Sequence, residues 1–285
     1  ARVAVVTDSV AQVPAEMARQ LGITVVPLTV QMDGRSYLDG IDLVPAELYR
    51  RMRRENILPT TAAPSLGQYV EAFVASLRNG ASGVLCVALS GRLSAGYSTA
   101  CKAAEMVQGE FPDCPVEVID SQQATISQGF VALAAARAAA DGRPLPEVRR
   151  AAEEAKPRVG FAATLETLEY LARGGRIGKA AFLLGSLISI KPILTISEGE
   201  VTPVERVRGT NHALQAIVDH VARETAGAKT LRLALMDADA PAEAARIEEL
   251  AVQTLQPVEV LHTVFTPVMG VHTGPGLVGL GYYFE

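Results

Sequence analysis

The stretch Cys86–Val87–Ala88–Leu89–Ser90–Gly91–Arg92–Leu93–Ser94–Ala95–Gly96–Tyr97–Ser98–Thr99–Ala100 combines a strand, a turn and the start of a helix. Its apolar first part favours a buried strand, and the Ser/Gly segment after it is typical of a turn. Ser94 is predicted to be the N-cap of this helix, because its hydroxyl can accept a hydrogen bond from a free amide two or three residues further on. Because such amides carry the positive end of the helix dipole, the stretch predicts an anion-binding site.

Apolar strand-like runs alternate with helical patterns on both sides of this stretch, which predicts an α/β fold. The alternation pauses at Gly142, Pro144 and Pro146 and resumes after a charged helix that ends near Pro157. We therefore expect two domains, residues 1–157 and 158–285, each a β-sheet flanked by helices. The last strand, 278–284, is expected to be able to return to the first domain.

Several local patterns give specific expectations. Ser65 precedes an amphipathic stripe and is expected to cap a helix. One apolar run covers 23–32, and the Asp33–Gly34 turn after it could pair it with 35–38. A long, mostly buried helix is expected over 122–140. A strand over 258–265 is expected to lead into a Gly/Pro loop that carries His272.

The composition excludes several classes of protein. The chain has 285 residues and a net charge of −5, so binding to nucleic acid or to an anionic membrane by bulk electrostatics is not expected. The three cysteines form no close pair, which argues against disulfides and a zinc site. The sequence opens directly on a strand, so we expect no signal peptide and a cytoplasmic location. The uncharged stretch 260–284 contains two prolines and five glycines and cannot form a membrane helix.

The residues that carry chemistry leave alternatives open. The G-x-G-x-x-G match at 274–279 lies close to the end of the sequence and opens no helix, so it is not a dinucleotide site. Ser94 with His272 as its base could form a hydrolase or acyl-transfer enzyme, although Arg92 stands where the nucleophile elbow needs glycine. No phosphate-binding P-loop is present, and the histidine spacing gives no metal site.

Two groups of arginines invite a binding interpretation. Arg50, Arg51, Arg53 and Arg54 cluster on one short helix; a solvated face balanced by Glu47 and Glu55 is the preferred interpretation, and a docking patch for an acidic partner is the alternative. Arg173 and Arg176 lie in a glycine-rich turn, where they could hold an anion or cap the preceding helix.

Taken together, the motifs resemble one family in both sequence and order. They are Thr7–Asp8–Ser9, Thr61–Ala62–Ala63–Pro64–Ser65, the segment 93–100, Arg173–Gly174–Gly175–Arg176–Ile177–Gly178, Ile190–Lys191–Pro192–Ile193–Leu194 and His272–Thr273–Gly274–Pro275–Gly276. This order is similar to that of DegV family proteins and covers essentially the whole chain. Ala62, Ala63 and Ala95 are departures from the usual family pattern.

The resemblance implies a two-domain α/β fold with a ligand tunnel between the domains. It implies binding of one long-chain fatty acid, such as palmitate or oleate, for lipid transport or for presentation to a separate fatty acid kinase subunit. No catalysis, cofactor or metal of its own is implied. Carried over by motif, Thr61, Ser94 and Ala95 contact the carboxylate, and His272 and Arg173 lie in the surrounding polar network.

The physical chemistry of a fatty acid agrees with this expectation. Burying about fifteen methylenes at about 0.8 kcal/mol each contributes about 12 kcal/mol before ordering costs. The tail therefore supplies affinity, while a few hydrogen bonds orient the head. The apolar run 182–190 is expected either to form plain core or to line the tail, and we predict Phe182, Leu187, Ile190 and Phe265 as tail-lining residues. A site for a different anionic ligand remains a third hypothesis beside the hydrolase.

Overall fold

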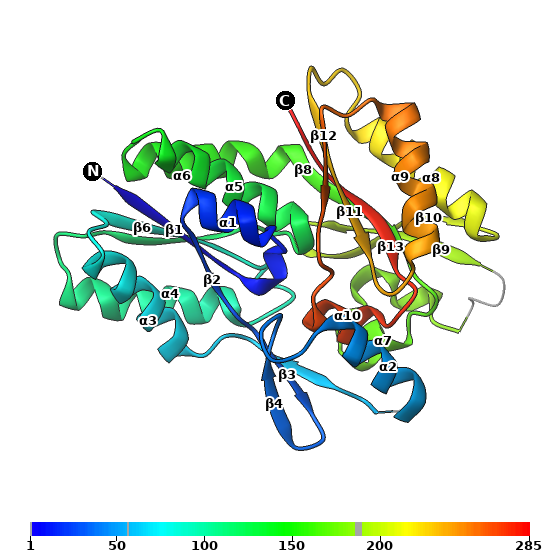
Figure 1. Cartoon of the computed structure of the whole chain (residues 1–285), viewed down its shortest axis with the longest axis horizontal. Coiled ribbons are helices and arrows are strands. Elements are labelled where there is room, and N and C mark those ends of the chain that lie inside the picture. Colours follow the sequence, from blue (N-terminus) through cyan, green and yellow to red (C-terminus); the bar gives the residue numbers. More distant parts are fainter. Residues whose placement is uncertain (1, 56, 186–189) are drawn as a thin grey trace.

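The computed structural model describes residues 2–55, 57–185 and 190–285. It contains a four-stranded sheet of order β2-β1-β6-β7, a six-stranded sheet of order β10-β9-β8-β13-β11-β12 and a three-stranded sheet of order β4-β3-β5. Figure 1 shows the two larger sheets next to each other, with the β3–β4 hairpin projecting below the junction between them. The α/β class expected from the sequence is confirmed.

The first sheet is parallel and covered on both faces, as parallel sheets are. Alternate residues of β1 enter different cores: Val3 and Val5 pack with α5 and α6, while Ala4 and Val6 pack with α3 and α4. The elements are β1 (Val3–Asp8), η1 (Ser9–Ala11), α1 (Ala15–Leu21), β2 (Ile23–Val26), α3 (Leu66–Arg78), β6 (Gly83–Ala88), α4 (Gly96–Glu110), β7 (Val116–Asp120), α5 (Thr125–Ala140) and α6 (Leu145–Ala155).

The second sheet is mixed. Its elements are η2 (Lys156–Arg158), β8 (Val159–Thr164), η3 (Gly178–Leu183), β9 (Lys191–Ser197), β10 (Glu200–Val207), α8 (Thr210–Glu224), β11 (Leu231–Asp237), α9 (Pro241–Leu255), β12 (Glu259–His262) and β13 (Val278–Phe284). The last strand, β13, pairs antiparallel with both β8 and β11. The expectation that it can return to the first domain is therefore wrong, because both of its edges are already occupied in the second sheet.

Helix α5 joins the two large sheets. It packs on the first sheet, and Phe130 on it lies 5.9 Å from Tyr283 of β13, ring centre to ring centre. A Cβ at Gly281 would come within 2.3 Å of Ile126, so glycine permits this close approach of β13 to the helix. One hydrophobic core therefore includes β1, α5 and β8. The chain passes to the second sheet at β8, and the division into domains 1–157 and 158–285 stays a prediction.

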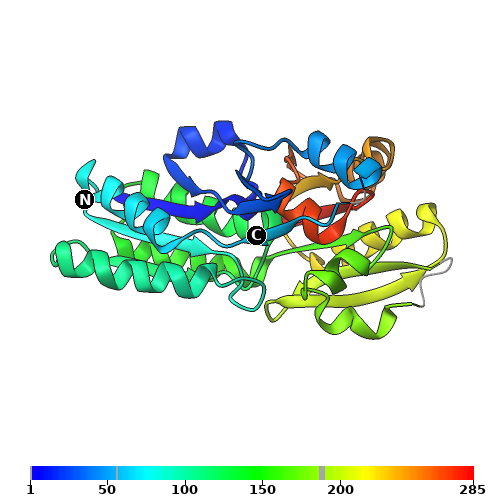
Figure 2. The same ribbon diagram turned by 90° about the horizontal axis from the view of Figure 1, so that it is seen from below.

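The third sheet covers the junction of the other two. Figure 2, from below, places α2 beside the red and orange C-terminal segments. The elements are β3 (Thr29–Met32), β4 (Arg35–Leu38), α2 (Pro45–Glu55), β5 (Thr60–Ala62), α7 (Glu169–Arg173) and α10 (Pro267–Thr273). The apolar run 23–32 divides into β2 and β3, which belong to different sheets, so one expected strand is two. The predicted hairpin at Asp33–Gly34 is confirmed.

The first turns of α3 and α10 are fixed by different kinds of contact, one local in sequence and one distant. Ser65 forms the expected cap of α3: its Oγ accepts from Gln68 N, and the Gln68 side chain accepts from Ser65 N. The expected Gly/Pro loop around His272 is instead the short helix α10. Its Val268 amide donates to Asp39 Oδ1 over 2.9 Å, so the first turn is fixed by a distant carboxylate that no local pattern reveals.

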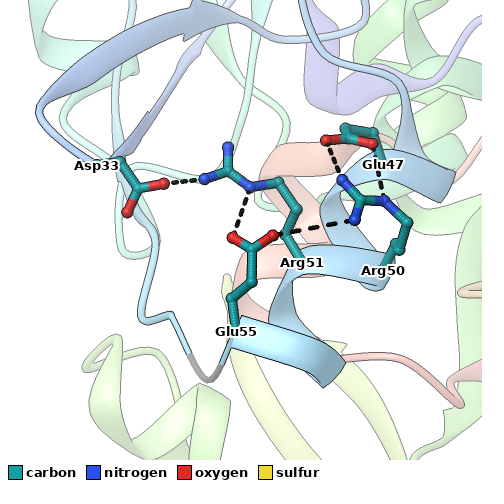
Figure 3. A network of polar contacts seen from close by, with 5 residues as sticks. All are labelled: Asp33, Glu47, Arg50, Arg51 and Glu55. Carbon is teal, nitrogen blue, oxygen red and sulfur yellow. Dashed lines mark hydrogen bonds and ion pairs between the residues drawn. The ribbon is translucent and has the colours of Figure 1, made fainter.

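The arginine cluster on α2 is largely paired, as Figure 3 shows. Arg50 lies 2.7 Å from Glu47, and Arg51 donates to Glu55 over 3.1 Å and contacts Asp33. Arg53 contacts Asp239, which follows β11. The predicted balance by Glu47 and Glu55 is confirmed for Arg50 and Arg51. The pairs with Asp33 and Asp239 reach other segments of the chain and were not predicted. Separately, no helix within the described ranges is long and apolar enough to span a bilayer.

The loop that follows β6 is attached to the second sheet by Ser90. Its Oγ donates to the Gly199 carbonyl over 2.7 Å at the β9–β10 turn. Gly199 has a φ of +83°, and a Cβ there would lie 2.6 Å from Ser90 Oγ. Ser90 is fully buried, so rotating its hydroxyl away would leave that hydroxyl without this acceptor.

We expect Gly199→Ala to destabilise the protein more than Gly227→Ala, by about 1–2 kcal/mol in urea unfolding. Gly227 is a matched control, because its φ is +82° and nothing lies within 4 Å of a Cβ there. Both variants carry the same left-handed backbone strain, and only Gly199→Ala breaks the contact with Ser90. Equal losses in the two variants would contradict the importance of this contact.

Candidate ligand-binding cavity

A cavity of about 170 Å³ lies where the three sheets meet. Most of its wall is apolar, and its polar side chains are few, as in sites that hold small organic molecules. The wall includes residues from β8, β9, β11 and α10 and from the loops after β1 and β6. The apolar lining residues are Val10, Leu28, Leu89, Leu93, Phe161, Leu165, Leu171, Leu194, Ile196, Val201, Met236, Phe265, Val268, Met269 and Leu277, with the alanines 63, 95, 124 and 163.

One end of the polar lining is a pair from distant parts of the chain. Thr61 on β5 and His272 on α10 approach to 2.8 Å between Oγ1 and Nε2. When His272 Nε2–H donates to Thr61 Oγ1, the threonine hydroxyl keeps its own proton for another acceptor. A carboxylate oxygen in the cavity is such an acceptor, so the histidine orients Thr61 as a donor.

His272 is held in its neutral form by its surroundings. Burial, together with the smaller effect of the nearby charge of Arg176, lowers the pKa of its imidazole to about 4. The ring packs against Gly174, where a Cβ would come within 2.5 Å of Nδ1. This position therefore requires glycine, and the imidazole is available as a neutral hydrogen-bonding group at ordinary pH.

Ser94 and Ala95 line the cavity at the start of α4. The Ser94 hydroxyl accepts from Gly96 N over 3.1 Å, the amide two residues further on, as the sequence predicts. The prediction of Ser94 as the N-cap is wrong, because the helix begins at Gly96 and its N-cap is Ala95. Because its oxygen already accepts from an amide, the hydroxyl proton of Ser94 is free to donate to an acidic ligand.

The geometry does not join Ser94 to a base. The hydrogen bond of His272 Nε2 goes to Thr61, and Nδ1 is buried with no partner among the described residues. A serine nucleophile needs a histidine on its hydroxyl and a group that orients that histidine. Ser94 and His272 share the cavity without forming this pair.

Arg176, rather than Arg173, is the arginine of the cavity wall. The Arg173 side chain is 56% exposed and lies 3.7 Å from Glu169 on its own helix, outside the lining. Arg176 donates from Nε to the Leu93 carbonyl over 3.0 Å and also contacts the Gly174 carbonyl. The resemblance assigned Arg173, not Arg176, to the polar network, although the sequence noted both arginines of the turn. In the structure this turn, with Gly175 at a φ of +70°, brings Arg176 to the wall instead.

The predicted tail-lining residues are only partly brought together. Phe265 lines the cavity, but Phe182 is 71% exposed and does not. Leu187 lies outside the described residues, and the half-buried Ile190 is absent from the lining. Among the described residues, this part of the wall includes Phe161 and Ala163 of β8, three consecutive residues of β9 from Leu194 to Ile196, and Val201 of β10.

Two acidic side chains are buried in the loops that support the cavity. Burial raises the pKa of Asp8 to about 6, although it accepts bonds from Leu89 N, Gln128 Nε2 and Val10 N. Burial also raises the pKa of Asp39, which accepts from Ser9 Oγ and Val268 N. The sequence placed Asp8 in the Thr7–Asp8–Ser9 motif without a structural role; its contacts show that it holds the strand-end loops of β1 and β6 together.

The chain is similar throughout its length to known proteins. Residues 2–285 match the model of a family described as "Uncharacterised protein, DegV family". A DegV domain-containing protein from Caldanaerobacter subterraneus subsp. tengcongensis is 31% identical over 284 residues, which cover 100% of this chain and 99% of the relative.

Two solved structures share the fold. A DegV family protein from Thermus thermophilus, described by its fatty acid binding, superimposes with a TM-score of 0.93 at 32% identity, covering 100% of both chains. A stearic acid-binding protein from Eubacterium ventriosum gives a TM-score of 0.89 at 26% identity, covering 98% of this chain and 97% of the other. The match of the family model to nearly the whole chain, together with these relatives, shows that this protein belongs to the DegV family.

Proposed function

We propose that this protein binds one long-chain fatty acid in the cavity, with its carboxylate at Thr61, Ser94 and the nearby Arg176 and its tail along β8–β10. The observation that carries the proposal is the combination, in one cavity, of a small polar end and an extended apolar wall. An amphiphile with one anionic head has this pattern of polarity. The fatty acids named for the related proteins from T. thermophilus and E. ventriosum support the same class of ligand.

The polar end suits a carboxylate better than a metal-bound or nucleotide ligand. Two hydroxyl donors, a neutral imidazole and one guanidinium give it a net positive character without a metal cluster. Arg176 already donates to two backbone carbonyls, so its charge attracts the carboxylate but its guanidinium does not form a bidentate pair with it. A carboxylate held in this way can be released to another protein, which suits transport of the fatty acid rather than its permanent storage.

We further propose that the protein performs no reaction of its own and needs no cofactor or metal. Its role would be lipid transport, or presentation of the carboxylate to a separate fatty acid kinase in the cytoplasm. The hydrogen bond of His272 to Thr61 rather than to Ser94 supports binding over hydrolysis. A hydrolase would instead predict stoichiometric labelling of Ser94 by a fluorophosphonate, which is the direct test of that alternative.

Native mass spectrometry of the purified protein tests the proposed ligand. We expect one co-purified acyl chain per protein, released by denaturation and identified as a long-chain fatty acid after extraction. A protein that is empty, and that also ignores added palmitate and oleate while a phosphorylated metabolite stabilises it, would support a different anionic ligand instead.

Removing both hydroxyls tests the head group. We expect Thr61→Val with Ser94→Ala to weaken fatty-acid binding about 100-fold, because two hydrogen bonds to a charged group are lost. Binding of the fatty acid methyl ester should change little. Thr60→Val is the matched control, because Thr60 lies next to Thr61 but contacts Gln31 and does not line the cavity. Equal affinity of the double variant and wild type would remove both hydroxyls from the site.

The burial of His272 predicts a pH dependence of stability. Its pKa falls from 6.5 in the unfolded chain to about 4 in the folded protein. As pH falls from about 6.5 to about 4, the unfolded chain takes up a proton that the folded protein does not, so wild type loses stability in that window.

We therefore expect His272→Gln to gain stability relative to wild type, by about 3 kcal/mol by pH 4, with no relative change above pH 7. The measurement is the free energy of unfolding in urea for both proteins at each pH. The comparison cancels the opposite contribution of Asp8, whose raised pKa favours the folded state as pH falls. A constant difference across the window would show that His272 titrates normally.

A further inference from the structure

The N-terminus of α5 meets the cavity at a second polar point. Ala124 and Thr125 both line the cavity wall. Thr125 is only 2% exposed, and its Oγ1 has no hydrogen-bond partner within the described part of the chain. A hydroxyl that is buried without a partner is uncommon, because it loses its hydrogen bonds to water and gains none in return. Burying an apolar side chain of the same shape carries no such cost. Thr195 and Thr273 line the cavity as well, and the Thr273 hydroxyl donates to backbone carbonyls. Among the hydroxyls of the described wall, that of Thr125 is the one buried without a partner.

The backbone at this point is strained as well. Thr125 has a φ of +59°, a left-handed conformation that β-branched residues rarely adopt. Strain of this kind is found at binding sites more often than elsewhere and is maintained by the surrounding structure. Here the structure maintains both the unusual backbone and the unpartnered hydroxyl on the cavity wall.

The helix that begins there presents a positive end. Helix α5 has 16 residues, and its N-cap, Ala124, supplies no side chain to the free amides of the first turn. An electronegative atom near Thr125 is therefore favoured by the helix dipole. The threonine hydroxyl can both donate to and accept from such an atom.

The charge nearby favours a neutral oxygen over an anion. Gln128, one turn further along α5, donates to Asp8 Oδ2 over 2.9 Å. A second anion at Thr125 would be repelled by that buried carboxylate, whereas a hydroxyl or carbonyl oxygen would not. The carboxylate end of a ligand therefore belongs at Thr61 and Ser94, and a neutral oxygen belongs at Thr125.

We propose that Thr125, at the start of α5, binds a neutral oxygen substituent on the acyl chain, so that the cavity selects hydroxy or keto fatty acids oxidised at one position along the chain. This inference rests on the proposed fatty-acid binding and adds a second recognition point to it. The distance between the two polar points then fixes which carbon must carry the oxygen.

The test compares stearic acid with a positional series of monohydroxystearic acids, by displacement of a fluorescent fatty acid. Each affinity is expressed as a ratio to that of stearic acid. We expect this ratio, in wild type, to be about tenfold higher for one positional isomer than for the others. Thr125→Val keeps the shape and removes the hydroxyl, so it should lose this preference. Thr125→Ser keeps the hydroxyl and should retain it.

Ser127→Ala is the matched control. Ser127 lies on the same helix, and its buried hydroxyl has no partner among the residues that the structure describes. It does not line the cavity, so the preference should persist in this variant. A flat series in wild type would overturn the proposal, as would a preference that survives in Thr125→Val. If Thr125→Val fails to fold, the wild-type series and Thr125→Ser decide the question. Failure of every acid, stearic acid included, to bind wild type would instead overturn the proposed function.

Discussion

The hydrogen bond between Thr61 and His272 depends on the whole fold and organises the polar end of the cavity. It joins residues 211 positions apart, one on the small third sheet and one on the helix before the last strand. Three other features make it possible: Asp39 fixes the first turn of α10, Gly174 leaves space for the imidazole, and β3 pairs with β5. A loss in any of these would move one partner of the pair.

Burial decides the chemical character of that pair. In water, a histidine side chain gains or loses its proton near neutral pH. Enclosed between α7 and α10 and close to Arg176, the His272 imidazole has a pKa of about 4 and stays neutral. It therefore serves as a fixed hydrogen-bonding group, and the positive charge at the cavity comes from Arg176 and the helix ends. This arrangement gives the proposed carboxylate neutral hydrogen-bonding groups and a separate source of positive charge.

Helix α5 has two functions in the architecture. Its apolar residues fill the space between the two large sheets, and glycines on its neighbours permit the close approach, as Gly281 does against Ile126. Its first turn also reaches the cavity wall, where Thr125 brings a hydroxyl into apolar surroundings. One element thus links the packing of the junction to the wall of the cavity, because a shift of α5 would change both.

Local patterns in the sequence determined the parts of this protein that depend on neighbouring residues. The cap at Ser65, the hairpin at Asp33–Gly34, the strand–turn–helix at 86–100 and the pairs of Arg50 with Glu47 and Arg51 with Glu55 all follow from short-range chemistry. Tertiary structure decided the rest. It placed Arg176 rather than Arg173 on the cavity wall, exposed Phe182, paired β13 between β8 and β11, and brought His272 to Thr61. Each of these outcomes depends on which distant segment of the chain packs beside the residue. The residue's own neighbours in the sequence carry no information about that packing.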